Sequence, residues 1–130
     1  MSQSLAAFAV VVRDYDEAIA WYRAALGFEL VEDRPMTPDK RWVLMAPRGD
    51  RGARILLARA ASPEQSARVG DQTGGRVFAF LHTDDFAGDH DRLLAHGARL
   101  CEAPRREAYG TVVVFEDLYG NRWDLIEPTR

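Results

Sequence analysis

The sequence predicts an α+β fold built from two tandem β-α-β-β-β modules. Short apolar runs of strand length and one amphipathic segment of helical spacing follow in the same order in both halves of the chain. A constant shift places Val11–Tyr15 on His82–Phe86, and one deletion then places Gly27 on Gly97. A chain of 130 residues, 47% of them hydrophobic, is long enough to bury a self-sufficient core, so we expect a single domain containing a duplication.

Composition excludes several classes of protein. Seventeen Lys and Arg residues against 20 Asp and Glu give a net charge of −3, which provides no basic surface for nucleic acid or anionic membranes. One cysteine, Cys101, rules out a disulfide within the chain and multi-cysteine zinc sites. No apolar run reaches the roughly 20 residues of a transmembrane helix. We expect a cytoplasmic protein without nucleic-acid or membrane partners.

The first module is expected over about residues 4–60, and its first helix has signals at both ends. Leu5–Val12 is a short apolar run typical of a buried strand. Asp14 can cap the following helix, Glu17 stands three residues later, and Gly27 suits a left-handed C-terminal cap. Three more strands are expected at residues 28–32, 42–46 and 53–59, separated by Pro- and Gly-bearing loops.

A connecting segment is expected over about residues 61–75, followed by the second module over about residues 76–128. Ser62 and Pro63 open a short helix within the connection, which ends at Gly74 and Gly75. The second module begins with a strand at residues 77–82 and a helix at residues 86–96. Its further strands are expected at residues 98–102, 111–116 and 122–127, with a charged loop at residues 105–107.

Two motifs carry a family resemblance that covers nearly the whole chain. The segment Val12–Phe28 reads VRDYDEAIAWYRAALGF, and the segment Phe115–Leu125 reads FEDLYGNRWDL. They resemble the opening and the closing hairpin of the glyoxalase / bleomycin-resistance / dioxygenase superfamily, also called vicinal oxygen chelate proteins. The resemblance implies that the two modules curl mixed sheets around a cleft, in a homodimer that binds a small-molecule ligand.

The same resemblance implies where a metal ion would be held. Metal-dependent members of the superfamily use side chains from the first and last strands of each module, which correspond here to Ala7, Leu56, Phe78 and Asp124. Only Asp124 carries a donor atom, whereas a catalytic divalent ion normally needs three protein ligands. We therefore expect no metal at the usual position and no cofactor.

Two polar residues are candidates for catalysis or ligand binding. Asp124 alternates with apolar neighbours; it can be a general base, the counter-charge of a cationic ligand, or a structural carboxylate satisfied by an arginine or backbone N–H. His82 shares strand parity with Phe78 and Phe80, so it can serve as an acid or base in the cleft or stand at the exposed end of its strand. His90 and His96 are expected to be solvated, and Cys101 to be a core residue.

Aromatic residues are the remaining candidates for a ligand site, because aromatic walls can stack a planar or cationic molecule. Plain core packing is the alternative for each of them. Tyr109, at the end of the charged loop, is additionally placed to close over the cleft as a lid. The aromatic candidates are Trp42, Phe78, Phe80, Tyr109 and Trp123.

Two function classes remain open on the sequence. The first is metal-independent binding of a small cationic or planar ligand, comparable to sequestration by bleomycin-resistance proteins. The second is an enzyme of lyase or dioxygenase type that uses Asp124 and His82, either without metal or with ligands outside the family's usual positions. The many chemistries found on this fold leave the ligand unassigned.

Overall fold

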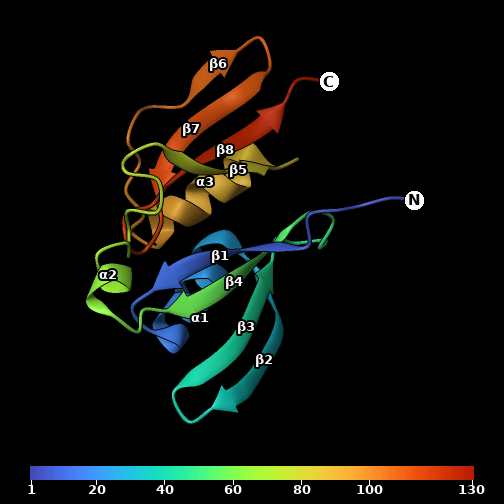
Figure 1. The fold of residues 1–130 in the computed structure, drawn as a ribbon. Coiled ribbons are helices and arrows are strands. Elements are labelled where there is room, and N and C mark those ends of the chain that lie inside the picture. The colour runs from blue at the N-terminus through green and yellow to red at the C-terminus, as the bar shows by residue number, and fades with distance from the viewer. The chain divides into compact units, whose positions relative to one another are not determined.

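Two mixed four-stranded sheets carry the α+β fold, one in each of the units into which the chain divides, Met1–Val69 and Gly70–Arg130. A computed structural model describes all residues from Met1 to Arg130. Each unit has the order β-α-β-β-β, so the expected duplication is confirmed (Figure 1).

The first unit is a sheet with one long helix on one face. Its elements are β1 (Ala7–Val12), α1 (Tyr15–Leu26), β2 (Glu29–Thr37), β3 (Lys40–Ala46), β4 (Arg54–Arg59) and the short α2 (Pro63–Ser66). The strand order is β1-β4-β3-β2, with β1 parallel to β4 and the other neighbours antiparallel. Helix α1 packs against β2, β3 and β4. The core side chains, each at most 2% exposed, are Val10, Val12, Ala18, Tyr22, Ala25, Phe28, Val43, Met45, Ala46, Ile55 and Leu57.

The predicted ends of α1 are confirmed. The Asp14 side chain accepts a hydrogen bond from the backbone N–H of Glu17 at 2.8 Å, which satisfies one of the free donors of the first turn. The Glu17 carboxylate in turn accepts from the Arg13 guanidinium. Gly27 ends the helix with φ 70°, a left-handed conformation that glycine adopts without steric cost.

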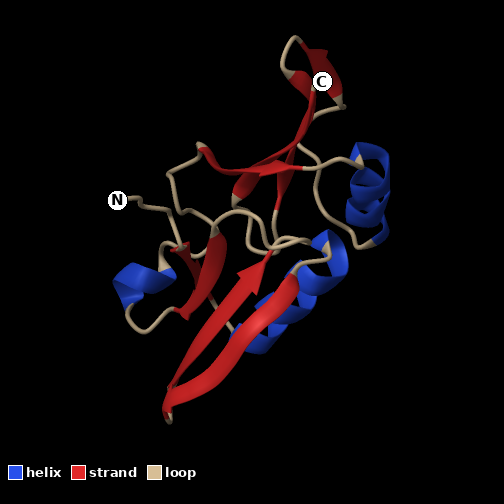
Figure 2. Ribbon diagram, turned by 90° about the vertical axis from the view of Figure 1, so that its right-hand side faces the viewer, coloured by secondary structure: helices blue, strands red, loops and turns tan.

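The hairpin of β2 and β3 is longer than the sequence predicted (Figures 1 and 2). The expected strands at residues 28–32 and 42–46 leave a loop between them, but β2 runs to Thr37 and β3 begins at Lys40. Pro35 lies inside β2, where its missing N–H is tolerated because β2 is the edge strand of the sheet. The turn itself is reduced to Pro38 and Asp39.

The second unit repeats this architecture. It contains β5 (Val77–His82), α3 (Phe86–Ala95), β6 (Arg105–Glu107), β7 (Gly110–Glu116) and β8 (Arg122–Pro128), in the strand order β5-β8-β7-β6. Strand β5 is parallel to β8, and the other neighbours are antiparallel. Helix α3 packs against β8. The innermost side chains of this unit are Leu93, Val112, Val113, Phe115 and Leu125.

The fourth strand of the second sheet is not where the sequence predicted it. Residues 98–102 were expected to form a strand, but only Leu100 makes an isolated bridge, to Phe115. Strand β6 is formed instead by residues 105–107, which were expected to be a charged loop. Pro104 lacks an N–H and separates the two segments, and the charged side chains are accepted because β6 is an edge strand.

The glycines between residues 70 and 75 are explained by backbone geometry. Gly70 has φ 77° and lies so close to the backbone carbonyl of Tyr119 that a Cβ would overlap it. Gly74 and Gly75 also have positive φ values, of 66° and 103°. This segment therefore needs glycine to form its turns, with no ligand required to explain it. Helices long and apolar enough to cross a bilayer are absent from the chain.

Candidate functional site

The two faces of the second sheet are distinguished by the position of α3. The backbone N–H of Phe86, at the start of α3, donates to Oε1 of Glu127 at 2.8 Å, so Glu127 points to the helix. Alternation along β8 then places Leu125 and Trp123 on the helix side and Asp124 on the opposite side. We call the opposite side the distal face; it carries Asp124 and its register partners Phe80 on β5 and Val114 on β7.

Asp124 is a buried carboxylate without a hydrogen-bond partner. Its residue is 8% exposed, and its Oδ1 atom makes no hydrogen bond. Burial raises the pKa of Asp124 above its ordinary value; the Arg105 charge opposes this shift and the Glu102 charge adds to it. The arginine or backbone partner that would make this a purely structural carboxylate is therefore missing.

Phe80 and His82 lie on the same face of β5. Phe80 is opposite Asp124 in the parallel register and is 65% exposed, an unusual position for a large apolar ring. His82 follows two residues later, pairs with Ile126 and is also exposed. The structure thus brings Phe80, His82 and Asp124 together on the distal face, with the histidine at the end of the strand.

Arg105 lies on the distal face as well, because its register partner Val112 is on that side of β7. Its Nε donates to both oxygens of Glu102, at 3.1 and 2.9 Å. Its second nitrogen, Nη1, donates to Glu107 at 2.8 Å and to the Tyr109 hydroxyl at 3.4 Å. These partners raise the pKa of Arg105, so the guanidinium is a fixed charge at every physiological pH.

Tyr109 belongs to the β6–β7 turn, so the charged loop from which a lid was expected is a hairpin. The turn is attached to the C-terminal end of the chain, since Thr129 donates to the carbonyls of Ala108 and Tyr109. The Tyr109 ring is 52% exposed. Its hydroxyl accepts from Arg105, which places Tyr109 at the margin of the distal face.

Trp123 and Phe78 pack with the core and do not line the distal face with Phe80. The strand register is irregular between Val77 and Ala79, so Phe78 does not keep the parity expected from the sequence. Its ring lies edge-on to Trp123, with centroids 5.8 Å apart. Trp123 is 3% exposed and stacks with Phe115 on the helix side.

Trp42 is in the first unit, on the face of its sheet turned away from α1. Neighbouring Arg41 contacts α1, so alternation along β3 directs Trp42 to the opposite side. The Arg34 guanidinium lies 5.8 Å from the centroid of the Trp42 ring, and Arg34 is also paired with Glu32. Trp42 thus already contacts a cation of its own sheet.

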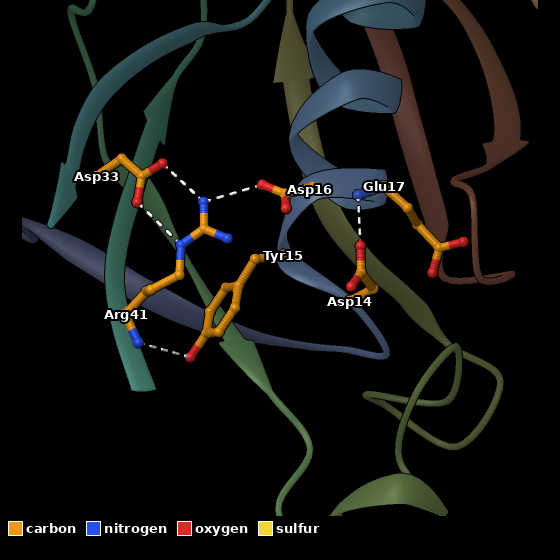
Figure 3. Close-up of polar contacts among 6 residues, drawn as sticks. All are labelled: Asp14, Tyr15, Asp16, Glu17, Asp33 and Arg41. Carbon is orange, nitrogen blue, oxygen red and sulfur yellow. Dashed lines mark hydrogen bonds and ion pairs between the residues drawn. The ribbon is translucent and has the colours of Figure 1, made fainter. Parts of the chain in front are cut away.

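A cluster of charged groups on the other side of that sheet fixes the start of α1 (Figure 3). Arg41 donates to both oxygens of Asp33, at 3.1 and 2.7 Å, and to Asp16 at 3.0 Å. The backbone N–H of Arg41 donates to the Tyr15 hydroxyl. The guanidinium groups of Arg41 and Arg59 lie 5.0 and 5.6 Å from the centroid of the Tyr15 ring. Because its charges are paired, we interpret this cluster as structural.

The donor set at the family's metal positions does not fit a divalent ion. Ala7, Leu56 and Phe78 have no ligating atom, and Asp124 alone cannot hold a metal. Elsewhere, no group of three or more His, Cys, Asp or Glu residues is arranged to hold an ion.

Several residues differ from their expected environment. Cys101, expected in the core, is exposed, because the strand expected around it is absent. His90, expected to be solvated, is half-buried and stacks on Phe86. Sequence reasoning also missed the Glu102–Arg105 pair on the distal face. The three-residue spacing of opposite charges was the available signal, but Glu102 was assigned to a strand at residues 98–102 and Arg105 to the charged loop that follows.

Comparisons with known proteins agree with this architecture. The model of the Glyoxalase/Bleomycin resistance protein/Dioxygenase superfamily matches residues 4–125. An uncharacterized protein of Shewanella frigidimarina is 52% identical over 128 residues, covering 98% of this chain and 95% of the relative.

Two solved structures are similar over almost their whole length. One is UcmS2, with a TM-score of 0.82 and 27% identity, covering 98% of this chain and 99% of the other. The second is TnmS3, described as an antibiotic binding protein from Streptomyces sp. CB03234. It has a TM-score of 0.77 and 27% identity, with 98% of each chain covered.

Proposed function

The chain belongs to the Glyoxalase/Bleomycin resistance protein/Dioxygenase superfamily, and on that premise we propose that it binds a small planar cation on the distal face of its second sheet. Binding uses no metal at the family's usual position, because three of the four residues there lack donor atoms. The ring of the ligand stacks on Phe80 and its positive group contacts Asp124.

The observation that carries this proposal is the pairing of Phe80 with Asp124. A ring that is 65% exposed stands directly opposite a carboxylate that is 8% exposed and unpartnered at Oδ1. An unpaired buried charge is costly, and a ligand that supplies a donor removes the cost. An exposed aromatic ring offers stacking area beside it. One ligand with both features gains both interactions.

The comparison with TnmS3 supports binding in preference to catalysis. That protein is described as antibiotic binding and shares 27% identity with this chain over 98% of its length. We therefore propose a sequestration role similar to that of bleomycin-resistance proteins, for a compound of antibiotic size. A homodimer is the proposed assembly, and sedimentation analysis tests it.

The test is a fluorescence titration with proflavine, a planar cation at neutral pH, and with acridone, its uncharged planar counterpart. We expect saturable proflavine binding that is weakened by Asp124→Asn and by Phe80→Ala, with acridone affected only by Phe80→Ala. Asp91→Asn and Leu94→Ala are the matched controls, because both residues are exposed on α3. Equal proflavine affinity in Asp124→Asn and wild type would overturn the proposal.

The position of His82 favours one alternative, an enzyme in which His82 and Asp124 exchange protons with a bound substrate. Both residues are on the distal face, and His82 lies two residues beyond Phe80, the register partner of Asp124. Chemical turnover of a bound compound, lost in His82→Ala with binding retained, would identify this activity.

A further inference from the structure

We propose that Glu102 and Glu107 hold the Arg105 guanidinium away from Asp124, and that this restraint makes the distal face selective for cations. The selectivity rests on the function proposed above, whereas the restraint itself is a property of the free protein. Arg105 is thereby a specificity-determining residue, because leaving Asp124 without a partner keeps that carboxylate available to a cationic ligand.

The strand register puts Arg105 within range of Asp124. Arg105 is opposite Val112 on β7, Val112 is opposite Ile126 on β8, and Ile126 is two residues from Asp124 on the same face. The two residues are offset by two strand spacings of about 4.8 Å and by two residues of about 3.4 Å along the strand, a separation of roughly 12 Å between Cα atoms that the long arginine and the aspartate can span together. The Arg105 charge already influences the titration of Asp124.

Arg105 nevertheless makes no hydrogen bond with Asp124, because other acceptors hold it. Both carboxylate oxygens of Glu102 accept hydrogen bonds from Nε of Arg105. An oxygen of Glu107 accepts from Nη1 of Arg105 at 2.8 Å. A guanidinium shared by two carboxylates is fixed in both direction and plane. The result is an arginine on the same face as a buried carboxylate, with that carboxylate left unpaired.

The restraint has a direct consequence for ligand choice. If Arg105 paired with Asp124, a cationic ligand would have to displace it and would meet a like charge. With Arg105 held by Glu102 and Glu107, the Asp124 carboxylate has no cation bonded to it, so its charge is available to a positive ligand. Removing the charges of Glu102 and Glu107 should release Arg105, which can then pair with Asp124 and compete with a cationic ligand.

A double-mutant cycle tests the restraint without any ligand. The cycle compares the Tm, at neutral pH, of the unchanged protein with that of Asp124→Asn, Arg105→Gln and the double variant. The same cycle is measured in a second background that carries Glu102→Gln and Glu107→Gln. We expect little coupling between Asp124 and Arg105 in wild type. In the Glu102→Gln/Glu107→Gln background we expect a clear stabilising coupling between them, so that Asp124→Asn lowers the Tm there. Glu64→Gln, an exposed carboxylate of α2, is the control background. Equal coupling between Asp124 and Arg105 in all backgrounds would overturn the proposal. If the double glutamate variant does not fold, Glu107→Gln alone gives the same comparison with a smaller perturbation.

Proflavine titrations of the same variants test the selectivity. We expect the Glu102→Gln/Glu107→Gln variant to bind proflavine about tenfold more weakly, and the added Arg105→Gln change to restore the affinity. Loss without restoration would show that Arg105 is not the cause and would overturn the selectivity. Coupling in the cycle together with no proflavine binding by wild type would support the restraint and overturn the proposed ligand.

Discussion

Phe80 and Asp124 are register partners on parallel strands, and their exposures are the reverse of what their chemistry favours. The phenylalanine is 65% exposed, whereas the aspartate is 8% exposed. Apolar rings are normally buried and carboxylates solvated, so both residues have an unfavourable environment in the free protein. A ligand that covers the ring and contacts the carboxylate relieves both, so binding should depend on both residues.

Asp124→Asn should weaken proflavine binding at least about tenfold, equivalent to about 1.4 kcal/mol, because it removes the charge and keeps the shape. The variant should remain folded, since no arginine depends on this carboxylate for a hydrogen bond. Titration of both proteins at neutral pH gives the measurement. A lower Tm with unchanged affinity would identify Asp124 as a structural residue.

Proflavine binding should also depend on pH through Asp124. Burial raises the pKa of Asp124, while the Arg105 charge lowers it and the Glu102 charge raises it further. Arg122 and His82 are the other ionisable groups on this face of β8 and β5. Affinity should fall as the pH is lowered through the raised pKa, because the neutral carboxyl loses its attraction for a cation. The control is Asp124→Asn, whose affinity should be flat across this range.

The stability of wild type and Asp124→Asn should diverge as the pH rises. A carboxyl group with a raised pKa in the folded state stabilises fully below its unfolded pKa, and this contribution is lost as the pH rises through the folded pKa. Asp124→Asn has no such loss. In urea unfolding, the free energy of unfolding of Asp124→Asn should therefore rise relative to that of wild type between acid and neutral pH. The opposite trend would mean that ionised Asp124 has a partner.

Phe80→Ala should reduce affinity for proflavine and acridone alike and leave Tm nearly unchanged. The ring is mostly solvent-exposed, so little buried area is lost when it is removed. Leu94→Ala, at a residue 52% exposed on α3, is the matched control and should affect neither ligand. A marked drop in Tm for Phe80→Ala alone would show that the ring packs within the fold.

Local signals in the sequence were sufficient to predict most elements. Asp14 and Gly27 marked the two ends of α1, because a cap and a left-handed glycine act within one helical turn. The repeated order of elements then predicted the duplicated α+β fold. Asp124 was identified through a resemblance, and the structure adds that its Oδ1 atom has no partner.

Structural features that depend on tertiary context were not predicted from the sequence. The irregular register at Phe78 turns its ring to Trp123, and strand alternation in the sequence cannot reveal such a shift. Strand β6 is three charged residues, which are read as a loop unless the neighbouring strand is known. The restraint on Arg105 depends on that strand and was missed for the same reason.

Asp33→Asn should lower stability at neutral pH and have no effect in acid. The hydrogen bond from Arg41 lowers the pKa of Asp33, so the stabilisation exists above the unfolded pKa and is lost as the pH falls through the folded one. The pair is partly exposed, so the loss should be about 0.5 kcal/mol. Urea unfolding across pH measures it, with Asp39→Asn as the control in the adjacent turn. An equal loss at all pH values would exclude a charge effect.

Asp117→Ala should be the most destabilising of these changes. The carboxylate is 6% exposed and accepts from the backbone N–H groups of Tyr119, Gly120 and Asn121. Its second oxygen accepts from the Asn121 amide and from Nε1 of Trp123. Removing it leaves several buried donors unpaired, so the cost should be about 3 kcal/mol or more.

The hydrogen bonds of Asp117 can be separated by two further variants. Asp117→Asn keeps one acceptor oxygen for the turn but turns an amide N–H₂ toward the Asn121 and Trp123 donors, so it should recover only part of the loss. Trp123→Phe removes a single donor and should cost less than either. Asp91→Asn, at an exposed position on α3, should unfold like wild type in urea. If Asp117→Ala unfolded at the same urea concentration as that control, the turn would not depend on its carboxylate.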